Sequence, residues 1–202
     1  MRLWIVSALC FAATLALGAF VAHRAPTPLD LAGASLRGHG VPLALFFTAL
    51  GRWPVLLSLG VLALGIAFSV RADAAPVLVL LGTQVASQGA NALVKTGFHR
   101  LRPEAFVLIR ERDFSYPSGH AVTAIVFFIG FGILAWHAPL PRPLQLLLTG
   151  VLVACALGIP WSRVALGAHY VTDVAGGLAF GTAWLCAAAA AYWSAISRIR
   201  LG

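Results

Sequence analysis

The sequence predicts an all-α fold, a polytopic membrane helix bundle of six transmembrane helices with an additional short interfacial helix. Hydrophobic residues make up 60% of the 202-residue chain, 10% are charged, and the mean hydropathy is +0.92. Soluble domains are far more polar, so the bilayer is the expected solvent. Because hydrocarbon cannot hydrogen-bond to the backbone, long apolar segments should be helical. The period-2 pattern of an outer-membrane barrel is absent, and the length predicts one domain over residues 1–202.

Turns rich in proline, glycine and charge separate the predicted spans from one another. The spans cover Leu3 to Val21, Val55 to Val70, Ala75 to Val94, Gly119 to Trp136, Leu144 to Ile159 and His169 to Trp193. Between the first two spans, the sequence predicts a loop over His23 to Gly40. The apolar segment Val41 to Gly51 is too short to cross a bilayer, and it is assigned to the interface or to a partial entry into the bundle. The first span could instead be a signal peptide, but it exceeds the roughly 7–15 residues of a signal core, which favours a retained helix.

Span parity predicts that the polar segments meet on one membrane face. The loop of Lys95 to Pro117 and the loop of Pro160 to Gly167 are separated by two crossings, so they should lie on the same side. The net charge of +8 gathers at the ends of apolar segments, which favours anionic lipids or phosphate-bearing substrates over nucleic acid. Once Lys95, Arg102 and Arg163 are set aside as candidate site residues, the other basic residues are too evenly divided for the positive-inside rule to decide the orientation. Cysteines 10, 155 and 186 share no spacing that predicts a disulfide or a zinc site.

One cluster of polar residues precedes the last span. His169 and Asp173 are four residues apart, so on a helix a carboxylate would lie beside an imidazole. Such a carboxylate fixes the imidazole tautomer and raises its basicity, leaving the far nitrogen free to attack. Arg163, in the preceding loop, could bind an oxyanion with two hydrogen bonds. A purely structural His–Asp pair at a helix start is the alternative.

Two further clusters come earlier in the chain. Ser118 and Gly119 open the fourth span, where a hydroxyl cap and free backbone N–H groups favour an anion, and His120 follows as a possible proton donor. Lys95 and Arg102 lie near the end of the third span. Helix capping and snorkelling of the lysine are the simpler interpretations of these residues. The neighbouring basic residues are predicted to lie at the rim, some of them paired with Glu104, Glu111 or Asp113; they are His99, Arg100, Arg110 and Arg112.

The third span also carries a polar stripe. Gln84, Gln88, Asn91 and Lys95 recur at helical spacing and therefore share one face. They could form hydrogen bonds between helices or line a hydrated cavity below the site. In the last span, Gly177 and Gly181 form a pair of small residues that predicts close helix packing.

Taken together, the clusters resemble the three signatures of the type 2 phosphatidic acid phosphatase (PAP2) family, whose superfamily includes vanadium haloperoxidases. The chain contains Lys-x6-Arg-Pro from Lys95, Pro-Ser-Gly-His at 117–120 and Ser-Arg-x5-His-x3-Asp at 162–173. No signature position between 95 and 173 is missing. Outside that region, the resemblance is limited to the six-span layout of the membrane branch. Val171 stands where many relatives have proline.

The resemblance implies a role for each signature residue. His169 would be a nucleophile that forms a phosphohistidine, oriented by Asp173, and His120 would protonate the leaving oxygen and then activate water. The oxyanion would be held by Lys95, Arg102, Ser118, the Gly119 amide and Arg163. Three cations can replace a metal in phosphoryl transfer, and we expect a metal-independent enzyme without a cofactor.

A lipid phosphate in the bilayer is the substrate that the resemblance implies: phosphatidic acid, phosphatidylglycerol phosphate, undecaprenyl diphosphate or a lipid A phosphate. It also implies a bacterial inner-membrane location with the site on the extracytoplasmic face. A lipid phosphotransferase and a non-enzymatic anion channel or carrier are the alternatives. Haloperoxidase activity is disfavoured because those relatives are larger and soluble.

Overall fold

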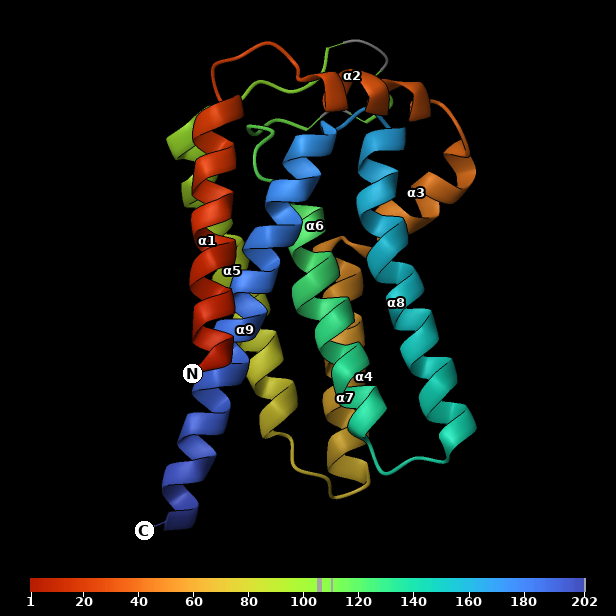
Figure 1. Ribbon diagram of the computed structural model, residues 1–202. Helices are drawn as coiled ribbons and strands as arrows, with labels where there is room; N and C mark the ends of the chain where they lie inside the picture. Colours follow the sequence, from red (N-terminus) through yellow and green to blue (C-terminus); the bar gives the residue numbers. More distant parts are fainter. Residues whose placement is uncertain (105–106, 110, 202) are drawn as a thin grey trace.

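The protein is described by a computed structural model over residues 1–104, 107–109 and 111–201, and these residues contain helices and no strand (Figure 1). Five helical segments are long and apolar enough to cross a membrane. They are α1 (Arg2–Val21), α5 (Ala75–Phe98), the continuous run of α6 (Gly119–Thr123), η2 (Ala124–Ile129) and α7 (Gly130–His137), α8 (Arg142–Ala165) and α9 (Val171–Leu201). A sixth span results if α3 (Val41–Leu50) and α4 (Trp53–Ser69), which meet at a 55° bend, count as one. The prediction of an all-α membrane bundle is confirmed.

Of the two placements predicted for the apolar segment Val41 to Gly51, the packing of α3 favours a partial entry into the bundle. Helix α3 packs one face against α8 through the buried Ala44 and Thr48, while Leu43, Leu45 and Phe46 are exposed. The short helices across one end of the bundle are instead α2 (Pro28–Gly33) and η1 (Ala34–Leu36), within a segment predicted to be a loop (Figure 1). A capping box between Thr27 and Asp30, with Pro28 in the first turn, starts α2. Pro28, which predicted a loop, therefore marks the start of a helix.

Two helix boundaries near the polar clusters also differ from prediction. Helix α8 continues through Pro160 to Ala165, so Arg163 lies in its last turn and not in a loop. A proline inside a membrane helix is tolerated where neighbouring groups replace the lost hydrogen bond. Helix α9 begins only at Val171, which leaves His169 in the connection before it. The His–Asp pair therefore joins a loop residue to a residue of the first helical turn.

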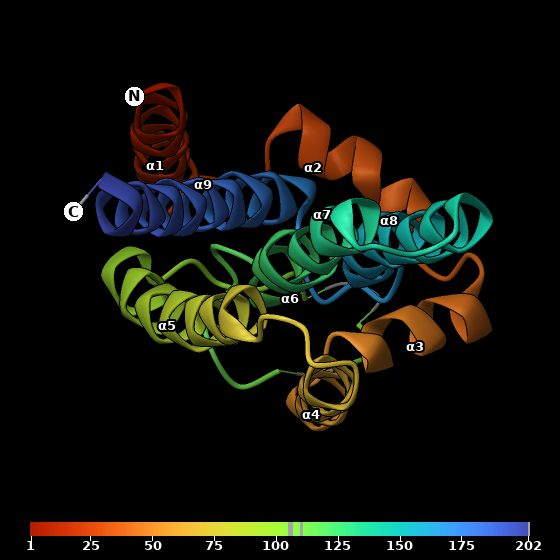
Figure 2. The ribbon, with the colours of Figure 1, turned by 90° about the horizontal axis from the view of Figure 1, so that it is seen from below.

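Tyr116 fastens the segment before α6 to two long helices that pack side by side, α1 and α9 (Figure 2). Its ring is fully buried, and its hydroxyl donates a 2.6 Å hydrogen bond to the carbonyl of Thr14 in α1. A Cβ on Gly18 of α1 or on Gly176 of α9 would overlap this ring. Glycine at both positions thus makes room for the tyrosine, which fixes the start of α6.

The predicted glycine pair packs α9 against α6 and η2, as expected. A Cβ on Gly181 would lie 3.0 Å from the Cβ of Ile125. A Cβ on Gly177 would overlap the backbone carbonyl of Ser118 and lie 2.8 Å from the Cβ of Ala121. Because Ser118 belongs to a polar cluster, this packing also sets the position of that cluster.

Substitution of Gly177 by alanine is expected to lower the free energy of unfolding by about 1–3 kcal/mol, the usual cost of overpacking. The methyl group must push Ser118 and the start of α6 away from α9. Thermal unfolding in detergent measures the effect. Gly150→Ala in α8 is the matched control, because a Cβ there meets nothing within 4 Å. Equal melting temperatures for the two variants would contradict the packing argument.

Candidate active site

All three polar clusters lie at one end of the bundle, where α5 and α8 end and α6 and α9 begin (Figure 1). Hydrogen bonds and ion pairs join Lys95, Arg102, His169 and Asp173 through the segment between α5 and α6. Arg163 lies beside them, since its carbonyl accepts a 3.2 Å hydrogen bond from the His169 amide. The convergence expected from span parity is therefore present in the structure.

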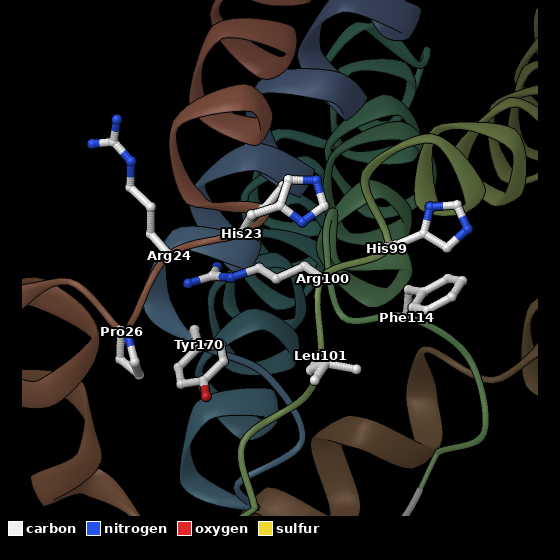
Figure 3. Close-up of a pocket in the computed structure, with 9 residues that line it drawn as sticks. His23, Arg24, Pro26, His99, Arg100, Leu101, Phe114 and Tyr170 are labelled. Atoms are coloured by element: carbon white, nitrogen blue, oxygen red, sulfur yellow. The ribbon is translucent and has the colours of Figure 1, made fainter.

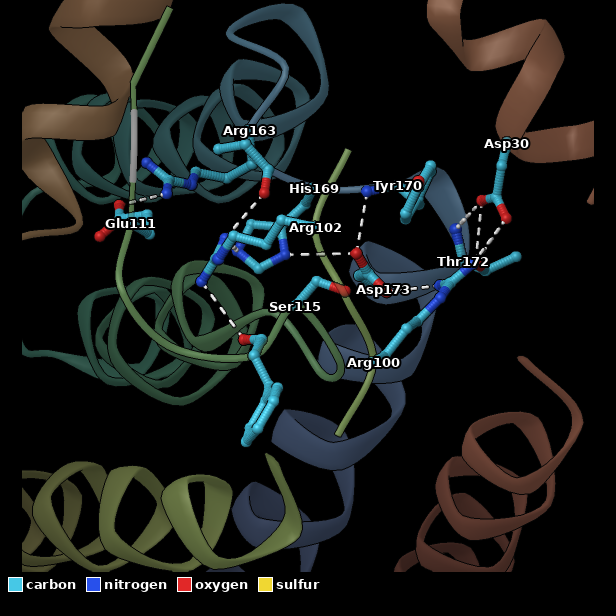
Figure 4. A network of polar contacts seen from close by, with 12 residues as sticks. Asp30, Arg100, Arg102, Glu111, Ser115, Arg163, His169, Tyr170, Thr172 and Asp173 are labelled. Atoms are coloured by element: carbon cyan, nitrogen blue, oxygen red, sulfur yellow. Dashed lines mark hydrogen bonds and ion pairs between the residues drawn. The ribbon is translucent and has the colours of Figure 1, made fainter. Parts of the chain in front are cut away.

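His169 faces Asp173 on one side and Arg102 on the other (Figure 4). Its Nδ1 lies 3.4 Å from Asp173 Oδ2, while Arg102 Nη1 lies 3.1 Å from its Nε2. Because a guanidinium can only donate, Nε2 is the acceptor and the imidazole proton is assigned to Nδ1. Asp173 Oδ2 also accepts a 2.9 Å hydrogen bond from the Tyr170 amide. Asp173 Oδ2 therefore contacts both the His169 side chain and the backbone of the next residue, Tyr170.

His169 is a neutral imidazole in this environment. Burial, followed by the nearby charges of Arg102, Arg163 and Lys95, holds the pKa of His169 well below its ordinary value. At neutral pH its Nε2 therefore carries a lone pair. The sequence predicted that this nitrogen is free, whereas the Arg102 guanidinium occupies it in the structure.

Two carboxylates from the segment between α5 and α6 pair with the three predicted oxyanion-binding cations and leave one net positive charge. Asp113 pairs with Lys95 at 2.8 Å and also with Arg102, and Glu111 lies 2.5 Å from Arg163. Burial alone would raise the pKa of Asp113, but Lys95 and Arg102 outweigh it and hold that pKa below its ordinary value. The carboxylate oxygens of Asp113 and Glu111 therefore contact the same cationic groups that the oxygens of a bound oxyanion would contact.

Removal of the Asp113 charge is expected to tighten the binding of an inorganic oxyanion. The side chain of Asp113 is 55% exposed, and half-exposed ion pairs contribute about 0.2–1 kcal/mol, which corresponds to a gain of up to about fivefold for Asp113→Asn. Calorimetric titration with orthovanadate measures this gain. Glu104→Gln is the control, because it removes one charge from an exposed position in the same segment. Weaker binding by Asp113→Asn would mean that Asp113 organises the cations instead of competing for them.

The second cluster contributes polar atoms that lack partners among the described residues. Ser118 is the N-cap residue of α6, as expected, but its side chain forms no capping hydrogen bond. Its Oγ is buried and unpartnered, as are Nε2 of His120 and Nε of Arg163. Buried polar atoms are normally satisfied, so such atoms suggest a ligand. The Ser118 amide donates to the Asp173 carbonyl at 3.0 Å, which ties this cluster to the dyad.

Two residues of the polar stripe form hydrogen bonds between helices. Gln84 donates to the Thr123 hydroxyl at 2.8 Å, and Gln88 donates to the same hydroxyl and to the Gly119 carbonyl, each at 3.1 Å. The interhelical interpretation is thus confirmed for Gln84 and Gln88. Through the Gly119 carbonyl, α5 helps to hold the start of α6.

Arg100 was assigned to the rim by sequence, and this prediction is wrong. Only 3% of its surface is exposed, and it donates to Asp173 Oδ1 at 2.5 Å and to Asp30 Oδ2 at 2.9 Å. His99 and Arg112 are exposed as predicted, and Arg110 lies outside the described residues. Asp30 was missed altogether. Its capping box with Thr27 was a visible local signal, but nothing in the sequence indicated a partner 70 residues away.

A cavity of about 610 Å³ is lined in part by Arg100, whose guanidinium also contacts Asp173 (Figure 3). Its lining includes His23, His99, Arg100 and Tyr170, and it includes neither His120 nor His169. Arg100 therefore forms part of a wall between this cavity and the His–Asp dyad. Within the described residues, no group of three or more His, Cys, Asp or Glu side chains could hold a metal ion.

A family profile, curated relatives and a solved structure are all similar to this chain, and all of them concern PAP2 proteins or lipid phosphatases. The sequence profile of the PAP2 superfamily matches residues 76–197. A lipid A 1-phosphatase of Rhizobium johnstonii is 31% identical over 81% of this chain and 67% of its own length. Phosphatidylglycerophosphatase B of Bacillus subtilis is 38% identical over 45% of each chain, so the match spans less than half of that relative. The crystal structure of a transmembrane PAP2-type phosphatidylglycerolphosphate phosphatase from Bacillus subtilis aligns with a TM-score of 0.77 and 25% identity, over 93% of this chain and 96% of that one.

Proposed function

The chain belongs to the PAP2 superfamily, and we propose that it is a membrane lipid phosphatase that hydrolyses a phosphate monoester or diphosphate through a phosphohistidine intermediate. The observation that carries this proposal is the His169–Asp173 dyad among three cations, together with His120, whose Nε2 has no partner among the described residues. The relatives named above are phosphatases of lipids, which supports a hydrolase acting on a lipid phosphate.

In the first step, Nε2 of His169 would attack phosphorus while the bond to the lipid oxygen or the leaving phosphate breaks. His120 would donate the proton that the leaving oxygen takes up. The new imidazolium would keep its Nδ1 proton facing Asp173. Because Nε2 accepts from Arg102 in the structure, substrate oxygens must first draw this guanidinium away from the histidine.

In the second step, water would attack the phosphohistidine and His120 would accept its proton, which releases inorganic phosphate and restores both histidines. Lys95, Arg102 and Arg163 would stabilise the equatorial oxygens in both steps, together with the Ser118 hydroxyl and the Gly119 amide. Three fixed cations supply the charge that a metal provides in other phosphoryl-transfer sites. We therefore propose a metal-independent reaction without a cofactor.

A phosphate-release panel on the purified protein in detergent tests the proposal. The substrates are phosphatidic acid, phosphatidylglycerol phosphate, undecaprenyl diphosphate and lipid A, each with and without EDTA and orthovanadate. We expect release from at least one lipid, no loss with EDTA, and inhibition by vanadate, which resembles a five-coordinate transition state. A strict need for magnesium would contradict metal independence, and no release from any lipid phosphate would contradict the proposal itself.

We further propose that the protein resides in a bacterial inner membrane with the site on the extracytoplasmic face. The apolar helices support a multi-pass membrane location, and a substrate with a bilayer-embedded tail would bring its phosphate to the helix ends. A Glu104→Cys variant, in a chain whose three native cysteines are replaced, should react with a membrane-impermeant maleimide in intact spheroplasts. Labelling only after lysis would place the site on the cytoplasmic face.

A further inference from the structure

Arg100 joins the dyad carboxylate to a second, distant carboxylate (Figure 4). One of its terminal nitrogens donates to Asp173 Oδ1 at 2.5 Å and to the Thr172 hydroxyl at 2.7 Å. The other donates to Asp30 Oδ2 at 2.9 Å, and the Tyr170 ring lies 4.5 Å from the guanidinium carbon. The guanidinium is thus fixed by carboxylates on two sides and by an aromatic face.

Asp30 is held as firmly as the arginine that it binds. Its carboxylate accepts hydrogen bonds from the Thr172 amide at 2.9 Å and from the Thr172 hydroxyl at 2.8 Å, and Thr27 donates to it within α2's capping box. Burial by itself would raise the pKa of Asp30, but the hydrogen bonds from Thr172, Thr27 and Arg100 outweigh it and hold the pKa below its ordinary value. Asp30 is therefore an ionised carboxylate that fixes both Arg100 and the residue before Asp173.

The charges of this group suit a histidine that becomes cationic during the reaction. Asp30, Arg100 and Asp173 are at most 3% exposed, and together they carry one net negative charge. A buried carboxylate without a partner is strongly disfavoured, so the ion pair with Arg100 favours the charged form of Asp173. A positive charge on His169 would face this net negative group directly, because its Nδ1 lies 3.4 Å from Asp173 Oδ2. Such a group stabilises the phosphorylated imidazole more than the neutral one, which is the condition for catalysis.

We propose that Arg100 and Asp30 are positioning residues that act on the nucleophile His169 through Asp173. This inference rests on the proposed phosphatase reaction of the same site. Among the described residues, the side chains of Arg100 and Asp30 contact each other and Asp173, Thr172, Tyr170 and Thr27, and neither contacts His169 or His120. Through Asp30, helix α2 thereby helps to position the His169–Asp173 dyad, although α2 precedes the PAP2-matched region of the chain.

Steady-state kinetics of Arg100→Gln, Arg100→Lys and Asp30→Asn test the proposal on a lipid that the wild-type protein hydrolyses. Arg100→Gln and Asp30→Asn should lower kcat by about 10- to 100-fold, while KM stays within about twofold, because the phosphate-binding cations are untouched. Arg100→Lys keeps the charge and should retain more activity than Arg100→Gln. Arg142→Gln, at the opposite end of the bundle, is the control and should match the wild type.

A double-mutant cycle with Asp173→Asn distinguishes positioning from a structural role. If Arg100 acts through Asp173, Arg100→Gln should cost much less in the Asp173→Asn background than in the wild type. If Asp173→Asn has no measurable turnover, the division of the effect between kcat and KM in the single variants decides the question. Thermal unfolding in detergent accompanies each measurement.

Three results would overturn the proposal: equal costs in both backgrounds, a kcat within twofold of wild type in both Arg100→Gln and Asp30→Asn, or failure of both Asp30→Asn and Arg100→Lys to fold. The last result would show that the ion pairs serve the fold alone. Failure of the proposed function is distinct, because the wild-type protein itself would then release no phosphate.

Discussion

Replacement of His169 by alanine is expected to lower kcat for lipid phosphate hydrolysis by at least about 10⁴-fold, as removal of a covalent nucleophile does in other enzymes. The imidazole offers the lone pair that forms the bond to phosphorus, and no other described nucleophile is paired with Asp173. Phosphate release gives the rate. A second measurement, incorporation of acid-labile radioactive phosphate after a brief exposure to labelled substrate, should be positive for the wild type and absent in His169→Ala.

His137→Ala is the matched control for this experiment. His137 ends α7 at the opposite end of the bundle from the site, so its loss should leave the rate unchanged (Figure 1). Melting temperatures of the two variants separate a chemical loss from unfolding. Full activity in folded His169→Ala protein would show that phosphate is not transferred to this histidine, and the proposed mechanism would be wrong.

The membrane spans were predictable because hydropathy and backbone hydrogen bonding leave few alternatives in a bilayer. The predicted span Ala75 to Val94 lies within α5, and Leu3 to Val21 lies within α1. The helix ends were less predictable. Pro160 indicated a break that the fold tolerates, and this moved Arg163 from a loop into the last turn of α8. Local rules describe an isolated helix, whereas tertiary packing decides where it stops.

The signature positions of the site were visible in the sequence, but their charge partners were not. The spacing of His169 and Asp173 predicted a contact within one segment. The pairings of Arg100 with Asp30 and of Arg163 with Glu111 join residues 70 and 52 positions apart. A single sequence contains no signal for such distances, and an arginine beside a signature is most simply placed at the rim. Burial of Arg100 follows from the position of α2 at the start of α9, where Asp30 meets Thr172.

Replacement of His120 by alanine is expected to divide the two steps of the reaction. A lipid alkoxide is a poor leaving group and needs a proton, so loss of the proton donor should slow its departure by about 10²- to 10⁴-fold. An aryl phosphate such as p-nitrophenyl phosphate releases a stable phenolate without that proton. Phosphorylation of His169 by the aryl substrate should therefore be nearly as fast in His120→Ala as in the wild type.

The second step still requires a proton acceptor with either substrate, because water must lose a proton when it attacks the phosphohistidine. With the aryl substrate, His120→Ala should release a single burst of p-nitrophenol, stall, and accumulate phosphorylated protein. The double variant His120→Ala/His169→Ala should give neither burst nor label. The geometry motivates this division: Nε2 of His120 is buried without a partner among the described residues, and His120 is close enough to affect the charge of His169. Equal slowing with both substrates and no phosphorylated protein would assign His120 to binding and leave the acid and base roles to another group.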